Sequence, residues 1–166
     1  GIEQGDGGAR GGGVGYDPLR DGTVWGERGT GAFGTNRRGR VSGRRDLATA
    51  LRATGIPFGA RPGKAAFLAA LVPLMDKVAG VRGSGSAALD LAYVAAGRYD
   101  GYWENGLYPW DVAAGILMVR ESGGHVTDIA GRAYKIGADD ICAGNDQLHQ
   151  PLRKLLQETS PVNPDR

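Results

Sequence analysis

Residues 82–124 read RGSGSAALDLAYVAAGRYDGYWENGLYPWDVAAGILMVRESGG, and this stretch decides the fold. Two of its segments, 87–97 and 110–121, are mostly apolar, and a short aromatic run, 99–104, separates them. A helix that is apolar nearly all round is shielded on several sides. A short aromatic run is typical of a strand. The stretch therefore predicts two buried helices with one strand between them.

Two carboxylates fall at the ends of these predicted elements. Glu104 ends the strand, and Asp111 falls in the first turn of the next helix, which Pro109 begins and Gly123 ends. Two carboxylates beside a tight connection can hold a hard cation and a hydroxylated ligand side by side. An ordinary alternative stays open, because an Asp in a first helical turn also complements the helix dipole.

A small-residue segment precedes the first of the two helices. Residues 83–86, Gly-Ser-Gly-Ser, offer free backbone N–H groups at a helix N-terminus. Such a segment can anchor a phosphate or a sugar-like hydroxyl. It is also the composition of a simple turn and helix cap.

Composition limits the function classes. The chain has 166 residues, enough for one domain with a substantial core, and a net charge of +2. The arginines of residues 37–45 are nearly balanced by acidic residues elsewhere, which argues against nucleic acid as a partner. Cys142 is the single cysteine, which excludes an internal disulfide. No apolar run is long enough for a membrane span and no secretory signal opens the chain, so we expect a cytoplasmic protein.

Glycine and turn residues divide the rest of the chain. Residues 1–13 are rich in glycine and are expected to be irregular, residues 14–159 form one α/β domain, and residues 160–166 form a disordered tail. Strands alternating with helices predict a layered α/β domain. The remaining predicted elements are strands at 14–16, 23–25, 31–33, 54–58, 125–128 and 141–143, and helices at 47–53, 62–78 and 147–158.

Three further interpretations concern single residues. In the predicted helix 62–78, Met75 lies on the apolar stripe and is interpreted as core filling. His125 and His149 are far apart in the sequence and are interpreted as unaccompanied surface or strand-edge residues.

Several motifs, in the right order and at the right separations, resemble the inositol monophosphatase family. Residues 109–115, PWDVAAG, followed by 121–124, ESGG, resemble its C-terminal signature, and 85–88, GSAA, and 101–104, GYWE, match upstream elements. The resemblance covers about residues 13–160. It implies an α/β fold, the layered sandwich of the inositol monophosphatase and sugar phosphatase type, represented here by its C-terminal half.

The resemblance also implies roles for five residues. Asp111 resembles the family's C-terminal metal ligand, Glu104 resembles the carboxylate that accepts a substrate hydroxyl, and Gly85, Ser86 and Ala87 resemble the segment bordering the substrate. The implied activity is Mg²⁺-dependent hydrolysis of a phosphate monoester, a small phosphorylated polyol best represented by myo-inositol 1-phosphate. Inhibition by lithium and a homodimer follow from the family in the same way.

One part of the family pattern is missing. Family members carry a second signature, a Glu followed by an Asp-Pro-Ile/Leu-Asp-Gly-Thr loop, which supplies most metal ligands. Residues 17–23, DPLRDGT, imitate this loop but carry an inserted Arg20, and we interpret them as a turn between strands. We therefore expect a truncated chain and assign no catalytic residue. Two alternatives stay open: a non-catalytic dimerising or regulatory homologue, and a related phosphatase acting on a nucleotide 3′-phosphate, a sugar bisphosphate or histidinol phosphate.

Overall fold

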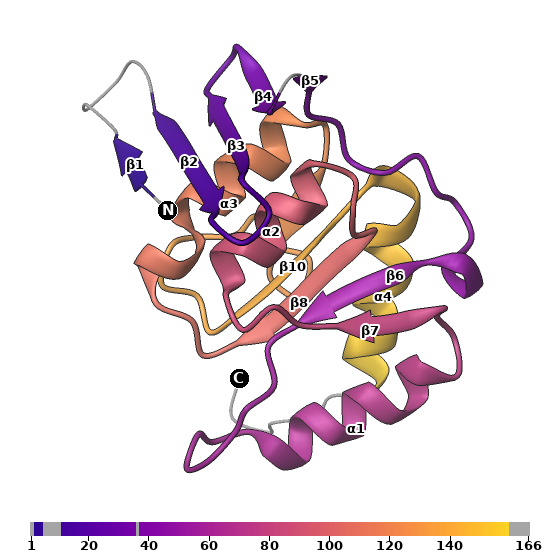
Figure 1. The fold of residues 1–166 in the computed structure, drawn as a ribbon. Helices are drawn as coiled ribbons and strands as arrows, with labels where there is room; N and C mark the ends of the chain where they lie inside the picture. The colour runs from indigo at the N-terminus through magenta and orange to yellow at the C-terminus, as the bar shows by residue number, and fades with distance from the viewer. Residues whose placement is uncertain (1, 5–10, 36, 160–166) are drawn as a thin grey trace.

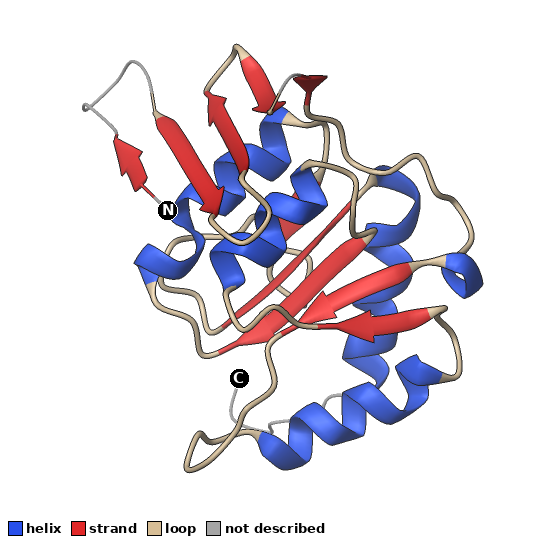
Figure 2. Cartoon of the chain, viewed as in Figure 1, coloured by secondary structure: helices blue, strands red, loops and turns tan. Residues whose placement is uncertain are grey.

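The computed structural model describes residues 2–4, 11–35 and 37–159, and these residues form four layers (Figure 1). One five-stranded sheet packs on a pair of helices, the same helices pack on a second five-stranded sheet, and two more helices cover that sheet's other face (Figure 2). The layered α/β arrangement predicted from the sequence is confirmed. No helix among the described residues is long and apolar enough to cross a membrane.

The first sheet is antiparallel and has the strand order β1-β2-β3-β4-β5. The predicted turn at residues 17–23 joins β2 to β3, as expected. The predicted irregular segment 1–13 differs from the structure, because it contains β1 and the start of β2; residues 5–10 and the predicted tail 160–166 lie outside the described residues. The strands are β1 (Ile2–Gln4), β2 (Gly12–Asp17), β3 (Gly22–Glu27), β4 (Gly31–Gly34) and β5 (Arg37–Arg38).

The second sheet is mixed and has the order β7-β6-β8-β10-β9. Strand β6 runs parallel to both of its neighbours, whereas β10 pairs antiparallel with β8 and β9. The sequence did not predict β7, because three residues carry too little pattern to be recognised. The strands are β6 (Leu51–Thr54), β7 (Gly80–Arg82), β8 (Gly101–Asn105), β9 (His125–Thr127) and β10 (Asp140–Gly144).

The helices α2 (Ala87–Ala95) and α3 (Pro109–Glu121) form the layer between the sheets, as their apolar sequences predict. They pack closely, because a Cβ at Gly115 on α3 would lie only 2.6 Å from the Leu91 side chain on α2. Pro109 occupies the first turn of α3, where its missing N–H is not needed. This packing fixes the ends of both helices relative to β8.

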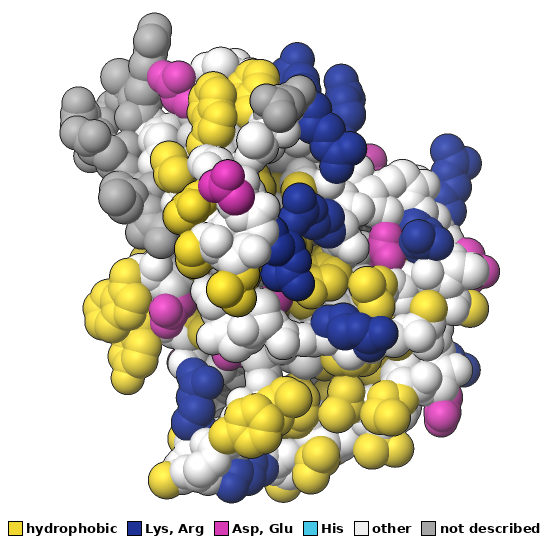
Figure 3. Space-filling model, viewed as in Figure 1, with side chains coloured by type: hydrophobic (Ala, Val, Ile, Leu, Met, Phe, Trp, Pro, Cys, Tyr) yellow, Lys and Arg dark blue, Asp and Glu magenta, His cyan; other side chains and the backbone are white. Residues whose placement is uncertain are grey.

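The outer helices are α1 (Lys64–Met75) and α4 (Asp146–Thr159). Trp103 on β8 and Cys142 on β10 pack against Leu74 of α1 and against Leu152 and Leu156 of α4. The interpretation of Met75 as core filling is wrong, because 61% of its surface is exposed. Apolar residues surround α1 rather than following one stripe, and its outer apolar side chains cover the lower edge of the molecule (Figure 3).

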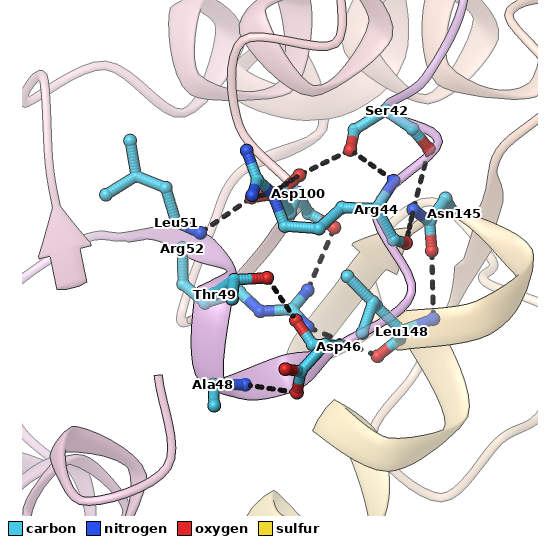
Figure 4. Close-up of polar contacts among 10 residues, drawn as sticks. All are labelled: Ser42, Arg44, Asp46, Ala48, Thr49, Leu51, Arg52, Asp100, Asn145 and Leu148. Atoms are coloured by element: carbon cyan, nitrogen blue, oxygen red, sulfur yellow. Dashed lines mark hydrogen bonds and ion pairs between the residues drawn. The ribbon is translucent and has the colours of Figure 1, made fainter. Parts of the chain in front are cut away.

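A buried polar cluster ties the chain before β6 to β8 and α4 (Figure 4). Asp100 accepts a hydrogen bond from the Ser42 hydroxyl, and a second one, of 2.6 Å, from the Leu51 N–H. The fully buried Arg52 donates to the carbonyl oxygen of Asp100 at 2.9 Å. We call these residues, with Arg44, Asn145 and Leu148, the Asp100 cluster.

This cluster explains one wrong prediction. The helix predicted at residues 47–53 is only a single turn, Leu47–Thr49, which Asp46 caps by accepting a hydrogen bond from the Ala48 N–H. Ala50 is completely buried, and the Leu51 N–H is bonded to Asp100 rather than to a helical carbonyl. The strand predicted at 54–58 therefore lies earlier, at Leu51–Thr54.

Candidate functional site

Glu104 lies near the end of β8, and its side chain is only 7% exposed. Side chains on a strand alternate between its faces, so Glu104 and Tyr102 share the face toward α2 and α3. The Tyr102 hydroxyl donates to Glu104 Oε2 at 2.5 Å. Burial raises the pKa of the Glu104 carboxyl, and the charge of Asp111 adds to this, whereas the Tyr102 hydrogen bond and the Arg61 charge oppose it.

Two residues that the sequence did not single out fix the position of Glu104. A Cβ at Gly55 would lie 2.0 Å from the Glu104 carboxyl carbon, so only glycine leaves room for this carboxylate. Arg61, in the loop between β6 and α1, lies 3.8 Å from Glu104 Oε1 and is half exposed. The Thr-Gly-Ile-Pro run after β6 is a recognisable signal for Gly55, but an isolated arginine in a loop carries none.

Asp111 occupies the third position of α3 and is half-buried. Its Oδ2 accepts a hydrogen bond from the Tyr108 N–H at 3.1 Å, which closes the first turn of the helix. One of the two carboxylate oxygens of Asp111 thus serves the first turn of the helix, in line with the ordinary structural alternative. Capping fixes the carboxylate in place and does not prevent it from binding a ligand.

The loop before α2 is held by a buried acid. Ser86 caps α2 through its Oγ, which accepts from the Leu89 N–H at 3.4 Å, and Gly85 has a φ of +79°. The Ser84 N–H donates to Asp90 Oδ1 at 3.2 Å. Asp90 is 1% exposed, and burial raises the pKa of its carboxyl to about 6. Asp90 is therefore a positioning residue that the sequence analysis missed.

These elements meet around one cavity of about 560 Å³, which we call the site cleft. All five residues for which the resemblance implies roles line it. They come from three separate parts of the chain, and the packing of α2 and α3 against β8 brings them together. The lining residues with predicted roles are Gly85, Ser86, Ala87, Glu104 and Asp111.

The cleft offers only part of a metal site. Carboxylate oxygens are the ligands that Mg²⁺ prefers, and Asp111 and Glu104 supply them. Within residues 2–4, 11–35 and 37–159, however, no three His, Cys, Asp or Glu side chains are grouped so that they hold a metal ion. Asp111 therefore fits the role of one metal ligand, and a complete site needs further donors.

The turn that imitates a metal loop has a structural role. Asp17 is 3% exposed, and its carboxylate accepts hydrogen bonds from the Tyr93 hydroxyl, the Leu19 N–H and Arg20. The Tyr93 hydrogen bond lowers the pKa of the Asp17 carboxyl most, and burial opposes it. The interpretation of residues 17–23 as a turn is confirmed.

The interpretation of the two histidines is confirmed for the position of His125, which is exposed on the edge strand β9, but it is wrong for His149, which is buried, and wrong in treating the two as unaccompanied. Their rings lie 5.8 Å apart, because β9 and the start of α4 are neighbours. His125 contacts the Asp146 carboxylate, and His149 Nε2 lies 3.0 Å from Thr127 Oγ1. Burial lowers the pKa of His149 to about 4, so this imidazole is neutral at pH 7.

The family is decided by comparison with known proteins. The model of the inositol monophosphatase family matches residues 7–160. This chain belongs to the inositol monophosphatase family. The inositol-1-monophosphatase of Caulobacter vibrioides is 47% identical over 147 residues, which cover 87% of this chain and 57% of that protein. The Nus factor SuhB of Escherichia coli (strain K12) is 46% identical over 143 residues, 86% of this chain and 54% of that protein.

Solved structures agree with this assignment. The extragenic suppressor protein suhB from Bartonella henselae has a TM-score of 0.84 and 48% identity, and the match covers 90% of this chain and 57% of that chain. The inositol monophosphatase from Anabaena has a TM-score of 0.79 and 39% identity over 93% of this chain and 63% of that one. The predicted sandwich of the inositol monophosphatase type is confirmed. The chain spans a little over half the length of these relatives.

Proposed function

We propose that this chain forms the substrate-facing part of a Mg²⁺-dependent phosphomonoesterase acting on a small phosphorylated polyol, with myo-inositol 1-phosphate as the best candidate. The observation that carries the proposal is the site cleft, in which Glu104, Asp111 and the loop 83–87 converge. The family membership and the relatives named inositol-1-monophosphatase support it.

Each element of the cleft has a task in this proposal. Asp111 is held by the Tyr108 N–H and provides one carboxylate donor to the metal. Glu104 accepts a hydrogen bond from a hydroxyl of the polyol, and the Tyr102 hydroxyl orients it for this. The loop 83–87 borders the substrate and presents backbone N–H groups at the start of α2. Mg²⁺, when bound, polarises the phosphoryl group and activates the attacking water.

The test measures phosphate release from myo-inositol 1-phosphate with and without Mg²⁺, on the 166-residue chain and on Asp111→Asn. Because the donor set of the described residues is incomplete, Mg²⁺-dependent binding of myo-inositol 1-phosphate to both chains is measured alongside turnover. We expect Asp111→Asn to weaken this binding by at least about tenfold, and to lose any Mg²⁺-dependent turnover, because a metal ligand is removed. Asp46→Asn is the matched control, since Asp46 is exposed and lies outside the cleft. Mg²⁺-dependent binding that is equally strong in Asp111→Asn and in the control contradicts the proposed role of Asp111.

A second candidate is a non-catalytic, regulatory homologue. It is favoured by the relatives named Nus factor SuhB, at 44–46% identity, and by the incomplete donor set of the described residues. Substrate binding that is the same with and without Mg²⁺ favours this candidate, and Mg²⁺-dependent turnover contradicts it. For both candidates we propose a homodimer, which size-exclusion chromatography with light scattering measures directly.

A further inference from the structure

A second cavity adjoins the site cleft on the other side of Glu104. It has a volume of about 480 Å³ and lies between α1 and the outer face of the second sheet. Its walls include Phe67 and Ala70 from α1, Trp103 from β8 and Leu156 from α4. We call it the side pocket.

The side pocket and the site cleft share three lining residues, Gly55, Arg61 and Glu104. Glu104 reaches both because it lies near the end of β8, where the sheet no longer separates the two faces. The strand alternation places Trp103 on the side-pocket face and Tyr102 on the cleft face. A ligand bound to Glu104 therefore has access to both spaces.

The two spaces differ in chemistry. The site cleft is edged by Asp111 and by the polar loop 83–87, whereas the deeper walls of the side pocket are aromatic and aliphatic. A volume of this size fits a small molecule, and apolar pockets with a few polar groups at one side are typical ligand sites. Two of its polar lining residues, Arg61 and Glu104, stand at the shared boundary, whereas Asn105 and Asp139 line the side pocket alone.

We propose that the side pocket is a subsite for an apolar ring on the alcohol that carries the phosphate. This inference rests on the proposed function and names its substrate class: besides polyols, the site takes phosphomonoesters of aromatic alcohols. The phosphate lies in the site cleft and the ring packs against Phe67 and Trp103. Because Arg61 lies only 3.8 Å from Glu104, the half-exposed Arg61 side chain swings aside in the complex so that the linking atoms pass beside Glu104. Burial of the ring then adds binding energy in proportion to its apolar area.

The test compares the binding of three ligands to the full chain in Mg²⁺ by calorimetry. (2-Naphthyl)methylphosphonate carries ring and phosphonate, methylphosphonate lacks the ring, and 2-naphthol lacks the phosphonate; none of them is a hydrolysable ester. We expect the first to bind at least about tenfold more tightly than methylphosphonate, because its ring leaves water. Equal affinity of the two phosphonates overturns the proposal.

Substitutions on α1 locate the ring. Ala66 lines the side pocket and Ala65, its neighbour, is exposed and lines neither cavity. Ala66→Trp fills the pocket and is expected to remove the ring's tenfold advantage without changing methylphosphonate affinity, whereas Ala65→Trp changes neither. Ala66→Leu, a smaller change, is expected to give a partial loss and keeps the test decisive if the tryptophan variant does not fold. An unchanged ring advantage in Ala66→Leu and Ala66→Trp overturns the proposal.

The same data separate this inference from the proposed function. If neither phosphonate binds but 2-naphthol binds and Ala66→Leu weakens it, the ring subsite stands and the phosphatase proposal fails. If methylphosphonate binds in a Mg²⁺-dependent manner and the ring adds nothing, the phosphatase proposal stands and the subsite fails.

Discussion

The two ends of β8 carry buried carboxylates with opposite surroundings. Asp100, just before the strand, and Glu104, near its end, are 4% and 7% exposed. Asp100 accepts from Ser42, from the Leu51 N–H and from Arg44, a half-exposed arginine that lies 3.2 Å away. Glu104 accepts one hydrogen bond, from Tyr102, and lies 3.8 Å from a half-exposed arginine beside a cavity.

The comparison separates a structural carboxylate, Asp100, from Glu104, for which we propose a role in binding. A buried charge costs free energy unless hydrogen bonds and opposite charges compensate for it. At Asp100 the compensation comes from within the fold, and the cluster fixes three elements relative to one another. At Glu104 the compensation is incomplete, and acceptor capacity remains for a ligand that enters the cleft. Burial alone does not distinguish the two residues, but the number and distance of their partners do.

The largest effect is expected from Asp100→Ala. The substitution leaves the Leu51 N–H and the Ser42 hydroxyl without their acceptor in a buried region. We expect the free energy of unfolding to fall by about 3–5 kcal/mol, as for other broken buried charge clusters. Urea unfolding followed by circular dichroism measures it, with Asp46→Ala at an exposed cap as the milder control. A loss below about 1 kcal/mol would show that the cluster is not structural.

The second-largest effect is the dependence of the free energy of unfolding on pH through His149. Its neighbour in the chain, Leu148, belongs to the Asp100 cluster. The unfolded chain protonates this histidine near pH 6.5, but the folded chain does so only near pH 4. The unfolded state binds more protons between these values, so the free energy of unfolding falls as the pH is lowered from 6.5 to 4, by about 2–3 kcal/mol.

The buried Asp90 titrates in the same pH range, but its effect on the free energy of unfolding is opposite to that of His149. Burial raises the pKa of the Asp90 carboxyl, so the folded state binds the extra proton and gains stability as the pH falls. The measurement is therefore the difference in free energy of unfolding between wild type and His149→Gln at several pH values. We expect the difference to shrink steadily below pH 6.5. A difference that stays constant from pH 7 to pH 4 contradicts a buried neutral His149.

Gly55→Ala is expected to lower stability less than the changes above, but to weaken ligand binding clearly. The new Cβ would overlap the Glu104 carboxylate, which has to move. We expect a loss of about 1–3 kcal/mol in the free energy of unfolding, and at least about tenfold weaker binding of myo-inositol 1-phosphate because the acceptor is displaced. Gly43→Ala, which has open space around it, is the matched control. Binding that is unchanged in Gly55→Ala would show that the position of Glu104 is not critical.

The smallest effect on stability is expected from Glu104→Gln. The amide keeps the shape of the side chain and removes a charge that burial disfavours, as the raised pKa indicates. We expect the free energy of unfolding to change by less than about 1 kcal/mol, and affinity for the polyol phosphate to fall. Asp100→Asn, the same substitution at the other end of β8, is expected to be clearly more destabilising. A larger loss of the free energy of unfolding in Glu104→Gln than in Asp100→Asn would contradict the comparison of the two carboxylates.

The sequence was most informative where several local signals agree. The segment 82–124 combines apolar composition, Pro109 at a helix start and glycines at a helix end, and its helices and strand lie as predicted. The prediction of a helix at residues 47–53 was wrong because a long-range hydrogen bond from the Leu51 N–H to Asp100 determines the conformation of that segment. The histidine pair could not be seen, because sheet order rather than sequence distance brings β9 and α4 together.

The site was predicted unevenly for the same reason. The motifs around Glu104 and Asp111, and the small residues of the loop 83–87, singled out residues that the structure brings together around one cavity; their roles stay predictions. Gly55 was not singled out, although the Thr-Gly-Ile-Pro run that contains it is a recognisable signal. Arg61 and Asp90 were missed because they act only through contacts between separate segments. Such contacts have no signal in local spacing or composition.

The most direct test of the comparison is a map of ligand binding by NMR. Myo-inositol 1-phosphate with Mg²⁺ is titrated into the ¹⁵N-labelled chain, and amide shifts are followed at both ends of β8. We predict that the changes centre on residues 83–87, Glu104 and Asp111, whereas Ser42, Arg52 and Asn145 in the Asp100 cluster stay unchanged. Shifts that centre on the Asp100 cluster, or no saturable shifts in the site cleft, would contradict the account.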